Sequence, residues 1–194
     1  FNGGGYGGHS EGDGMTYGSP IISVARSQPV ELYEQRYPVR IRKFAIREES
    51  AGAGRYRGGF GAIMETEFIK GEGKASVLGD RGAFGPRGLY GGKDGAPCKI
   101  EFILDNQAYS PPHGLKDSGI ILKPGDLIRL HTPGGGGYGD PLERNPFLVA
   151  DDVRRQYISL ETARDLYGVL FQENMVEVDE AATIARRQAL RQEL

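Results

Sequence analysis

A histidine and two acids near the start of the chain are the first candidates for chemistry. His9, Glu11 and Asp13 alternate with small residues inside a segment rich in glycine. An imidazole and carboxylates at this spacing suit general acid–base catalysis or a share in a metal site. The same residues also fit a solvated polar loop. We take His9 and Asp13 as candidate catalytic residues.

A second candidate is a charged pair framed by glycines. Asp80 and Arg81 stand between Gly79 and Gly82. An arginine in this position is able to hold a carboxylate or carbonyl oxygen through a charge-assisted hydrogen bond. The alternative is an ordinary surface ion pair, which would contribute little. Asp80 and Arg81 join the candidate catalytic residues.

The other histidines, the single cysteine and a basic segment give weaker signals. His113 and His131 lack a second ligand at metal-binding spacing, so we expect hydrogen-bonded structural residues. Cys98 has no neighbouring base, and a nucleophilic role is not expected. We expect a solvated or ion-paired face from the basic residues Arg40, Arg42, Lys43, Arg47, Arg55 and Arg57.

Two glycine clusters match a dinucleotide-binding fingerprint in spacing alone. They are Gly3-x-Gly5-x-x-Gly8 and Gly134-x-Gly136-x-x-Gly139. The fingerprint needs a helix that starts inside the motif, whereas Pro141 and Pro146 delay the helix here. We therefore expect tight turns, positive φ angles and close backbone approaches, some of them lining a substrate cleft. A nucleotide-binding module is the alternative, and it predicts ATP binding by this chain alone.

Elements that position these residues are read from periodicity and punctuation. Alternating apolar residues predict strands over 39–46, 60–69, 74–78 and 99–104, with a β-bulge near Lys43, and a further strand near 21–24. Asp105-Asn106 and Pro124-Gly125 predict turns. Helices are expected over 30–37, from Pro146, from Ser159 and from Asp179. This predicts an α+β fold: a glycine-rich, mainly antiparallel β body over 1–144 and a mainly helical tail over 145–194.

Composition narrows the class of protein. The chain has 194 residues, a net charge of −2, one cysteine and no long apolar run. It therefore lacks the basic field of a nucleic-acid binder, a membrane span and a disulfide framework, and we expect a cytoplasmic protein. Glycine accounts for 31 residues, against a usual ~7% of a chain. The chain opens at Phe1, in the middle of a glycine-rich segment, so we expect a piece of a longer polypeptide.

Several blocks resemble the hydantoinase B family. Residues 31–38, Glu-Leu-Tyr-Glu-Gln-Arg-Tyr-Pro, resemble its E-x-x-E-x-R-Y-P segment, and residues 50–61 resemble its S-G-G-A-G-R-Y-R-G-G-x-G signature, with Ala51 replacing a glycine. The blocks at 80–81, 86–97, 125–126 and 132–141 follow in the family's order. The resemblance covers about residues 29–157, and it indicates only the C-terminal third of a family B chain.

The resemblance implies a role in a hetero-oligomeric enzyme. Family members belong to ATP-dependent N-methylhydantoinases, 5-oxoprolinases, caprolactamase, and acetone and acetophenone carboxylases. An actin-like A-type partner would bind ATP and Mg²⁺ and phosphorylate a carbonyl or enol oxygen. A divalent metal would be held by the upstream portion of the B-type subunit. We expect ATP-dependent hydrolysis of a cyclic amide or lactam; the alternatives are the equivalent part of a ketone carboxylase and a non-catalytic assembly domain.

Overall fold

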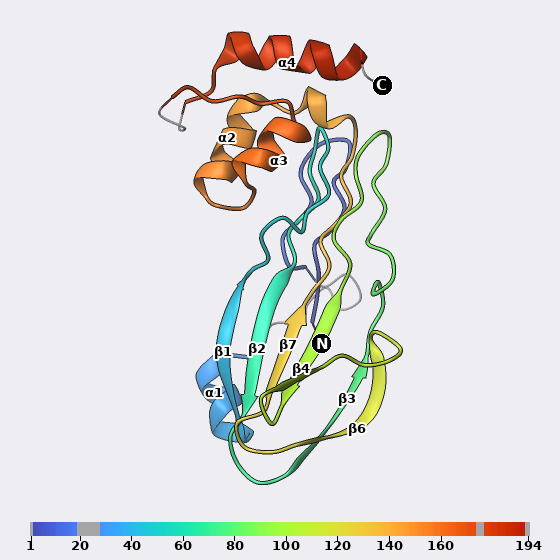
Figure 1. Ribbon diagram of the computed structural model, residues 1–194, viewed down its shortest axis with the longest axis vertical. Coiled ribbons are helices and arrows are strands. Elements are labelled where there is room, and N and C mark those ends of the chain that lie inside the picture. Colours follow the sequence, from blue (N-terminus) through green and yellow to red (C-terminus); the bar gives the residue numbers. More distant parts are fainter. Residues whose placement is uncertain (1, 19–27, 174–176, 193–194) are drawn as a thin grey trace.

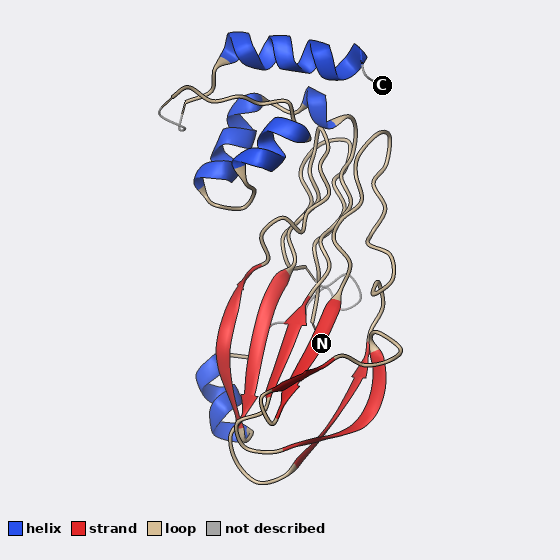
Figure 2. Cartoon of the chain, in the orientation of Figure 1, coloured by secondary structure: helices blue, strands red, loops and turns tan. Residues whose placement is uncertain are grey.

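The computed structural model describes residues 2–18, 28–173 and 177–192 (Figure 1). Strands gather at one end of an elongated molecule and helices α2, α3 and α4 at the other, with long extended segments between them (Figure 2). The expected α+β fold is confirmed. The strand expected near residues 21–24 lies outside the described residues.

The larger sheet has five antiparallel strands. Their order across the sheet is β1-β2-β7-β4-β5, with β1 at one edge. The strands are β1 (Val39–Ile46), β2 (Ala62–Phe68), β7 (Leu127–His131), β4 (Lys99–Leu104) and β5 (Gln107–Tyr109). The expected bulge is confirmed, because the β1–β2 register shifts between Ile41 and Lys43.

A second, two-stranded sheet covers one face of the first. It pairs β3 (Gly73–Leu78) with β6 (Lys116–Leu122). Apolar side chains from both sheets form a core around Phe68, Phe102 and Ile120. Both expected turns are present: Asp105 and Asn106 have φ angles of 49° and 64°, and Gly125 has a φ of 98°. Positive φ at these positions is what the two turn types require.

Beyond the larger sheet, five extended segments run side by side. They are residues 2–8, 12–18, 50–61, 85–97 and 132–139, drawn as loops in Figure 2. Backbone hydrogen bonds join the last segment to three others: Gly8 N–H donates to Gly136 (2.8 Å), Gly52 N–H to Gly135 (2.8 Å) and Leu89 N–H to Gly137 (2.9 Å). We call this array the glycine bundle.

The central segment of the glycine bundle faces three neighbours in rotation. A methyl group built on each of Gly134, Gly135, Gly136 and Gly137 would overlap, in turn, a carbonyl oxygen of Ser50, Tyr6, Arg87 and Ala53. Positions three apart thus point at the same neighbour, which is the three-residue repeat of a polyproline II-like chain. These four glycines are buried, and any side chain there would collide with backbone.

Close approach, rather than turn geometry, explains most of the glycines in these segments. Among the described residues, positive φ occurs at Gly71, Gly91, Gly114, Gly119, Gly125, Gly139 and Gly168. Of these seven, only Gly91 and Gly139 belong to the glycine bundle. The expectation of close approaches is therefore confirmed, while the expected positive φ angles are mostly elsewhere.

Helices cap the far end of the glycine bundle. They are a 3₁₀ turn η1 (Pro141–Glu143) and the helices α2 (Pro146–Arg154), α3 (Leu160–Asp165) and α4 (Glu180–Gln192). Side chains begin two of them as expected: Asn145 accepts from Phe147 N–H (2.9 Å) and Ser159 from Thr162 N–H (3.0 Å). A fifth helix, α1 (Val30–Arg36), packs beside β1, and Pro29 is its N-cap residue.

A second apolar core joins the helices to the glycine bundle. Ala53 and Phe60 from the glycine bundle pack with Val149, Tyr167 and other residues of the tail. The chain therefore buries apolar surface across residue 144, where the sequence predicts a boundary. The described part of the chain has no bilayer-crossing helix, since its helices are too short or too polar.

Candidate functional site

His9 lies at the tip where the first two glycine segments turn. Its backbone N–H donates to Gly12 (3.0 Å), and Gly12 N–H donates back (3.3 Å). The ring Nδ1 accepts the N–H of Glu11 at 3.3 Å, which fixes that nitrogen as an acceptor. The imidazole is exposed. A surface histidine held in this way is placed to meet a group that comes from outside this chain.

Asp13, four residues later, is held by two arginines. Arg144 approaches with both terminal nitrogens, Nη1 to Oδ1 at 2.6 Å and Nη2 to Oδ2 at 2.8 Å. The backbone N–H of Arg57 adds a third bond to Oδ1 at 2.9 Å. Arg144 is only 1% exposed. This two-pronged geometry is the strong form of an arginine–carboxylate pair.

Asp152 of α2 closes the group, which we call the arginine–aspartate cluster (Asp13, Arg57, Arg144 and Asp152). It accepts from Arg57 Nε at 3.1 Å and from Arg144 Nη2 at 3.1 Å. The guanidinium of Arg57 also lies 4.6 Å from the ring centre of Phe60. Two positive and two negative charges balance in the cluster. It ties the tip of the first glycine segments to the helical tail.

Charge and burial set the protonation of this cluster. Burial alone would raise the pKa of Asp13, but hydrogen bonds and charge from Arg144 and Arg57 outweigh it, and the net pKa is lowered. Burial strongly raises the pKa of the neighbouring Tyr167, so its hydroxyl stays neutral. A carboxylate held ionised by two arginines acts as an anchor. A direct catalytic role for Asp13 stays a prediction.

Asp80 and Arg81 lie at the opposite end of the glycine bundle, just after β3. Arg81 has a left-handed φ of 62°, and its carbonyl accepts the N–H of Cys98 at 2.8 Å. Both residues are exposed, and no ion pair joins them in the described structure. The four predicted residues thus form two separate pairs, one beside the helices and one beside the sheets.

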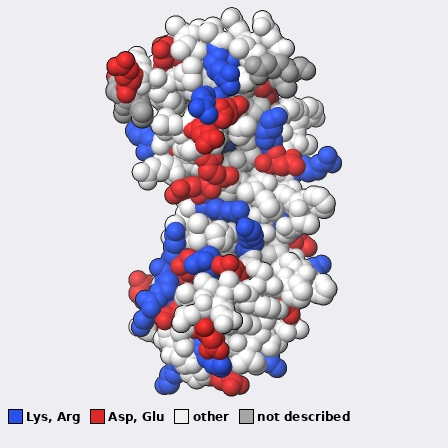
Figure 3. All heavy atoms as spheres, in the orientation of Figure 1, with Lys and Arg blue, Asp and Glu red and all other residues white. Residues whose placement is uncertain are grey.

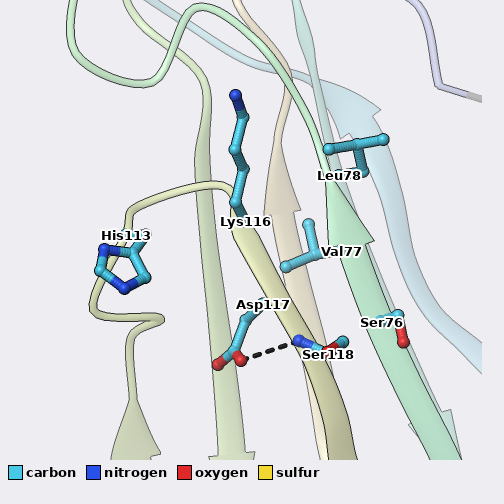
Figure 4. A pocket seen from close by; sticks show the side chains of 7 residues that line it. All are labelled: Ser76, Val77, Leu78, His113, Lys116, Asp117 and Ser118. Carbon is cyan, nitrogen blue, oxygen red and sulfur yellow. Dashed lines mark hydrogen bonds between the residues drawn. The ribbon is translucent and has the colours of Figure 1, made fainter.

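An open pocket borders the second pair (Figure 4). It lies between β3 and the loop and strand that lead into β6, and it is lined by Ser76, Val77, Leu78, His113, Lys116, Asp117 and Ser118. Its carboxylate is already engaged: Asp117 accepts from Tyr109 Oη (2.6 Å) and Ser118 N–H (2.8 Å). The pocket therefore has few free polar groups to fix a ligand.

The remaining candidates face partly buried surroundings. Burial lowers the pKa of His131, and the nearby charges of Arg47 and Arg129 lower it further. Burial raises the pKa of Cys98 despite the charge of Arg47, so the thiol is not activated. Within the described ranges, no three or more His, Cys, Asp or Glu side chains converge as metal ligands. These residues therefore do not fit the donor set that a divalent metal needs.

Backbone amides of the second glycine cluster are also engaged. Gly135 N–H donates to Gly59, Gly137 N–H to Lys93 and Gly139 N–H to Leu89, each at 2.9 Å. A phosphate cradle needs such amides to point at the ligand. These three amides serve the glycine bundle instead, and no helix starts inside the motif.

Comparison with known proteins places the chain in a family. Residues 1–141 match the Hydantoinase B/oxoprolinase family, so the chain belongs to it. The B component of a putative D-/L-hydantoinase of Pseudomonas sp. (strain NS671) is 34% identical over 168 residues, covering 86% of this chain and 28% of that protein.

Two solved structures share the fold. The ATP-dependent caprolactamase of Pseudomonas jessenii superposes with a TM-score of 0.79 at 31% identity, covering 95% of this chain and 32% of that one. A nucleotide-free acetone carboxylase gives 0.78 at 23% identity, covering 95% and 29%, which establishes the fold alone. The chain spans about three tenths of these relatives. Named subunits among the relatives indicate a multi-subunit enzyme.

Sequence reasoning misses most of the arginine–aspartate cluster. Arg57 stands in the family-like block 50–61, but its basic neighbours in the sequence suggest a solvated or ion-paired face. Arg144 and Asp152 carry no signal, since nothing in a linear sequence shows that Arg144 is almost fully buried. Their importance becomes visible only when the chain is folded.

Proposed function

We propose that this chain is the C-terminal segment of a hydantoinase B-type subunit. It would act with an ATP-binding A-type partner and the upstream portion of the same subunit to hydrolyse a cyclic amide. The observation that supports this most is the family match over residues 1–141, together with 31% identity to an ATP-dependent caprolactamase of the same fold.

The proposed chemistry solves a problem of electrophilicity. The A-type partner, with ATP and Mg²⁺, would move a phosphoryl group to the carbonyl oxygen and release ADP. Water then adds to the carbon, and the amine nitrogen takes a proton and leaves. A second water hydrolyses the acyl phosphate to a carboxylate and inorganic phosphate. Any divalent metal of the B-type subunit is assigned to residues outside those that the structure describes.

In this proposal the chain supplies a rigid wall of the reaction chamber. The glycine bundle brings five backbones together without side chains between them, and the arginine–aspartate cluster fixes its far end. Rigid support of this kind keeps reacting groups in register. His9, Asp13, Asp80 and Arg81 are the residues proposed to reach the chamber.

The class of reaction is tested with the complete complex. Hydantoin, 5-oxoproline and caprolactam are each supplied with ATP, and release of ADP is compared with formation of the ring-opened product. We expect ADP release and ring opening to rise together for one substrate. ADP release that instead requires a ketone and bicarbonate would assign the complex to the carboxylases and overturn the hydrolase proposal.

The site residues are tested in the same complex. Replacing Arg81 with alanine is expected to reduce turnover by about tenfold or more, as loss of one charge-stabilising group commonly does. Arg87→Ala is the matched control, an exposed arginine in the neighbouring glycine segment. Unchanged turnover in the Arg81 variant would remove it from the site.

A non-catalytic assembly domain is the second candidate. The separation of the two predicted pairs and the engagement of the glycine amides within the glycine bundle favour it. It predicts that His9→Ala and Arg81→Ala both keep normal turnover, whereas variants that disrupt the glycine bundle abolish assembly. The first candidate predicts loss of turnover in a complex that still assembles.

A further inference from the structure

Helix α1 is the one described α-helix that buries none of its residues. Each of α2, α3 and α4 places at least one side chain in the interior, while no residue of Val30–Arg36 is buried. A surface helix normally presents an apolar stripe to a core. A seven-residue helix is too short to be stable in water by propensity alone. Its stability therefore depends on contacts with other parts of the protein.

Apolar and aromatic side chains of α1 face solvent. Leu32 is 52% exposed and Tyr37, its C-cap residue, is 45% exposed, with Val30 and Tyr33 also exposed. The rings of Tyr33 and Tyr37 lie 5.1 Å apart, which makes one continuous surface. We call these four residues the α1 face. Tyrosine and leucine grouped in this way are typical of the buried centre of an interface.

A polar contact and its own backbone hold α1 in place. Glu34 Oε1 accepts the N–H of Ile41 at 2.7 Å, which covers part of the free edge of β1. Tyr37 N–H donates to Tyr33 at 3.0 Å, and Tyr37 accepts from Val39 N–H at 2.8 Å. These bonds orient the helix without burying its apolar side chains. The α1 face is therefore preorganised and uncovered.

The same segment carries a family-like block that this fold does not use up. Residues 31–38 resemble the E-x-x-E-x-R-Y-P segment. Glu34 has its partner in β1, but Glu31 and Arg36 form no ion pair within the described ranges, and Tyr37 is exposed. Exposed residues of a motif point to binding more than to packing.

Basic residues border the α1 face along β1. Arg40 and Arg42 share one acid, Glu67, at 3.8 and 2.7 Å, and Lys43 is exposed beside them. Figure 3 shows Lys and Arg gathered along the edge of the molecule where β1 lies in Figure 1. The surface that fits here has an apolar centre and an acidic rim.

We infer that the α1 face is the docking surface for the remaining portion of the B-type subunit. This rests on the proposed function, since it takes the chain as part of such a protein. These 194 residues correspond to 28% of the hydantoinase relative and to 32% of the caprolactamase chain. Most of a B-type subunit therefore has no counterpart here, and it has to contact this segment somewhere. The α1 face offers apolar area, a rigid scaffold and a charged border in one place.

Photo-crosslinking in the complete complex tests the inference. A benzoylphenylalanine replaces Leu32, and a second protein carries it at Ile184 on α4, which is 59% exposed. The Leu32 probe is expected to link to peptides from the remaining portion of the B-type subunit, and the Ile184 probe is not. Links from Leu32 to the A-type partner, to a second copy of this segment, or to nothing would each overturn the inference.

A charge substitution gives an independent readout. In the complete B-type subunit, Leu32→Asp should lower the melting temperature by several degrees, whereas Ile184→Asp should leave it unchanged. An unchanged melting temperature for Leu32→Asp would count against docking at α1. If Leu32 crosslinks within the B-type subunit while no ATP-dependent ring opening is found, the docking stands and the proposed function fails. If ring opening is found without that crosslink, the reverse holds.

Discussion

Single side chains of the arginine–aspartate cluster should matter more than any other charged group that the structure describes. Arg144→Ala would leave the carboxylates of Asp13 and Asp152 partly buried without their main partner. Loss of one member of a buried pair costs about 3–5 kcal/mol. Chemical denaturation should show this drop in the free energy of unfolding. Arg154→Ala is the control, because its exposed pair with Asp151 should be worth about 0–1 kcal/mol.

Acid should weaken the same cluster through Asp13. The pKa of Asp13 is lowered in the folded protein relative to its ordinary value of 3.8. Its stabilisation is therefore complete above that value and is lost as the pH falls through the lower, folded pKa. We expect the free energy of unfolding to decline below about pH 4 by more in the native protein than in Asp13→Asn. Equal pH slopes in the two proteins would contradict the ion-pair account.

Among the elements, the glycine bundle should be sensitive to a single methyl group, but only at certain positions. In Gly135→Ala the new Cβ would overlap the backbone of Tyr6, and backbone cannot rotate away as a side chain does. Overpacking typically costs about 1–3 kcal/mol, and this site should reach or exceed the upper end. Gly7→Ala is the control, since its Cβ would meet only Gly136, at 3.8 Å. A similar melting temperature for both variants would show that the segments are not tightly packed.

Elements of the fold differ in how far the sequence predicts them. Strands, the Asp105-Asn106 turn and the caps of α2 and α3 follow from neighbours within a few residues, so local pattern is enough. The glycine bundle depends on which segments meet across the chain. Gly134 and Gly135 look like turn residues in the sequence, and only the approach of Ser50 and Tyr6 explains them.

The candidate site is harder to predict for the same reason. Asp13 is selected by its nearness to His9, yet its strongest partner, Arg144, lies 131 positions away. Asp80 and Arg81 are selected as a pair of opposite charges, and the structure gives them no mutual ion pair in its described part. Sequence proximity identifies residue types that suit chemistry, whereas their partners are set by tertiary contacts.

At the scale of the whole molecule, two apolar cores are separated by a region without one. The first core lies between the two sheets around Phe102, and the second joins Phe60 to the helical tail around Val149. The glycine bundle connects them (Figure 1) through backbone hydrogen bonds such as that of Gly137 with Lys93. Because its central segment bonds to several neighbours at once, one strand of the array cannot loosen without releasing others.

This interlocking predicts that the two cores unfold together. Phe102 is 1% exposed, and Phe102→Ala should cost about 3–5 kcal/mol. If the glycine bundle couples the cores, peptides from β4 and from α2 should lose hydrogen-exchange protection at the same, lowered denaturant concentration. Val149→Ala should shift both regions in the same way from the other end. Retained protection of α2 after β4 has opened would mean that the glycine bundle acts as a hinge between independent units, and that the rigid wall assigned to it in catalysis is not rigid.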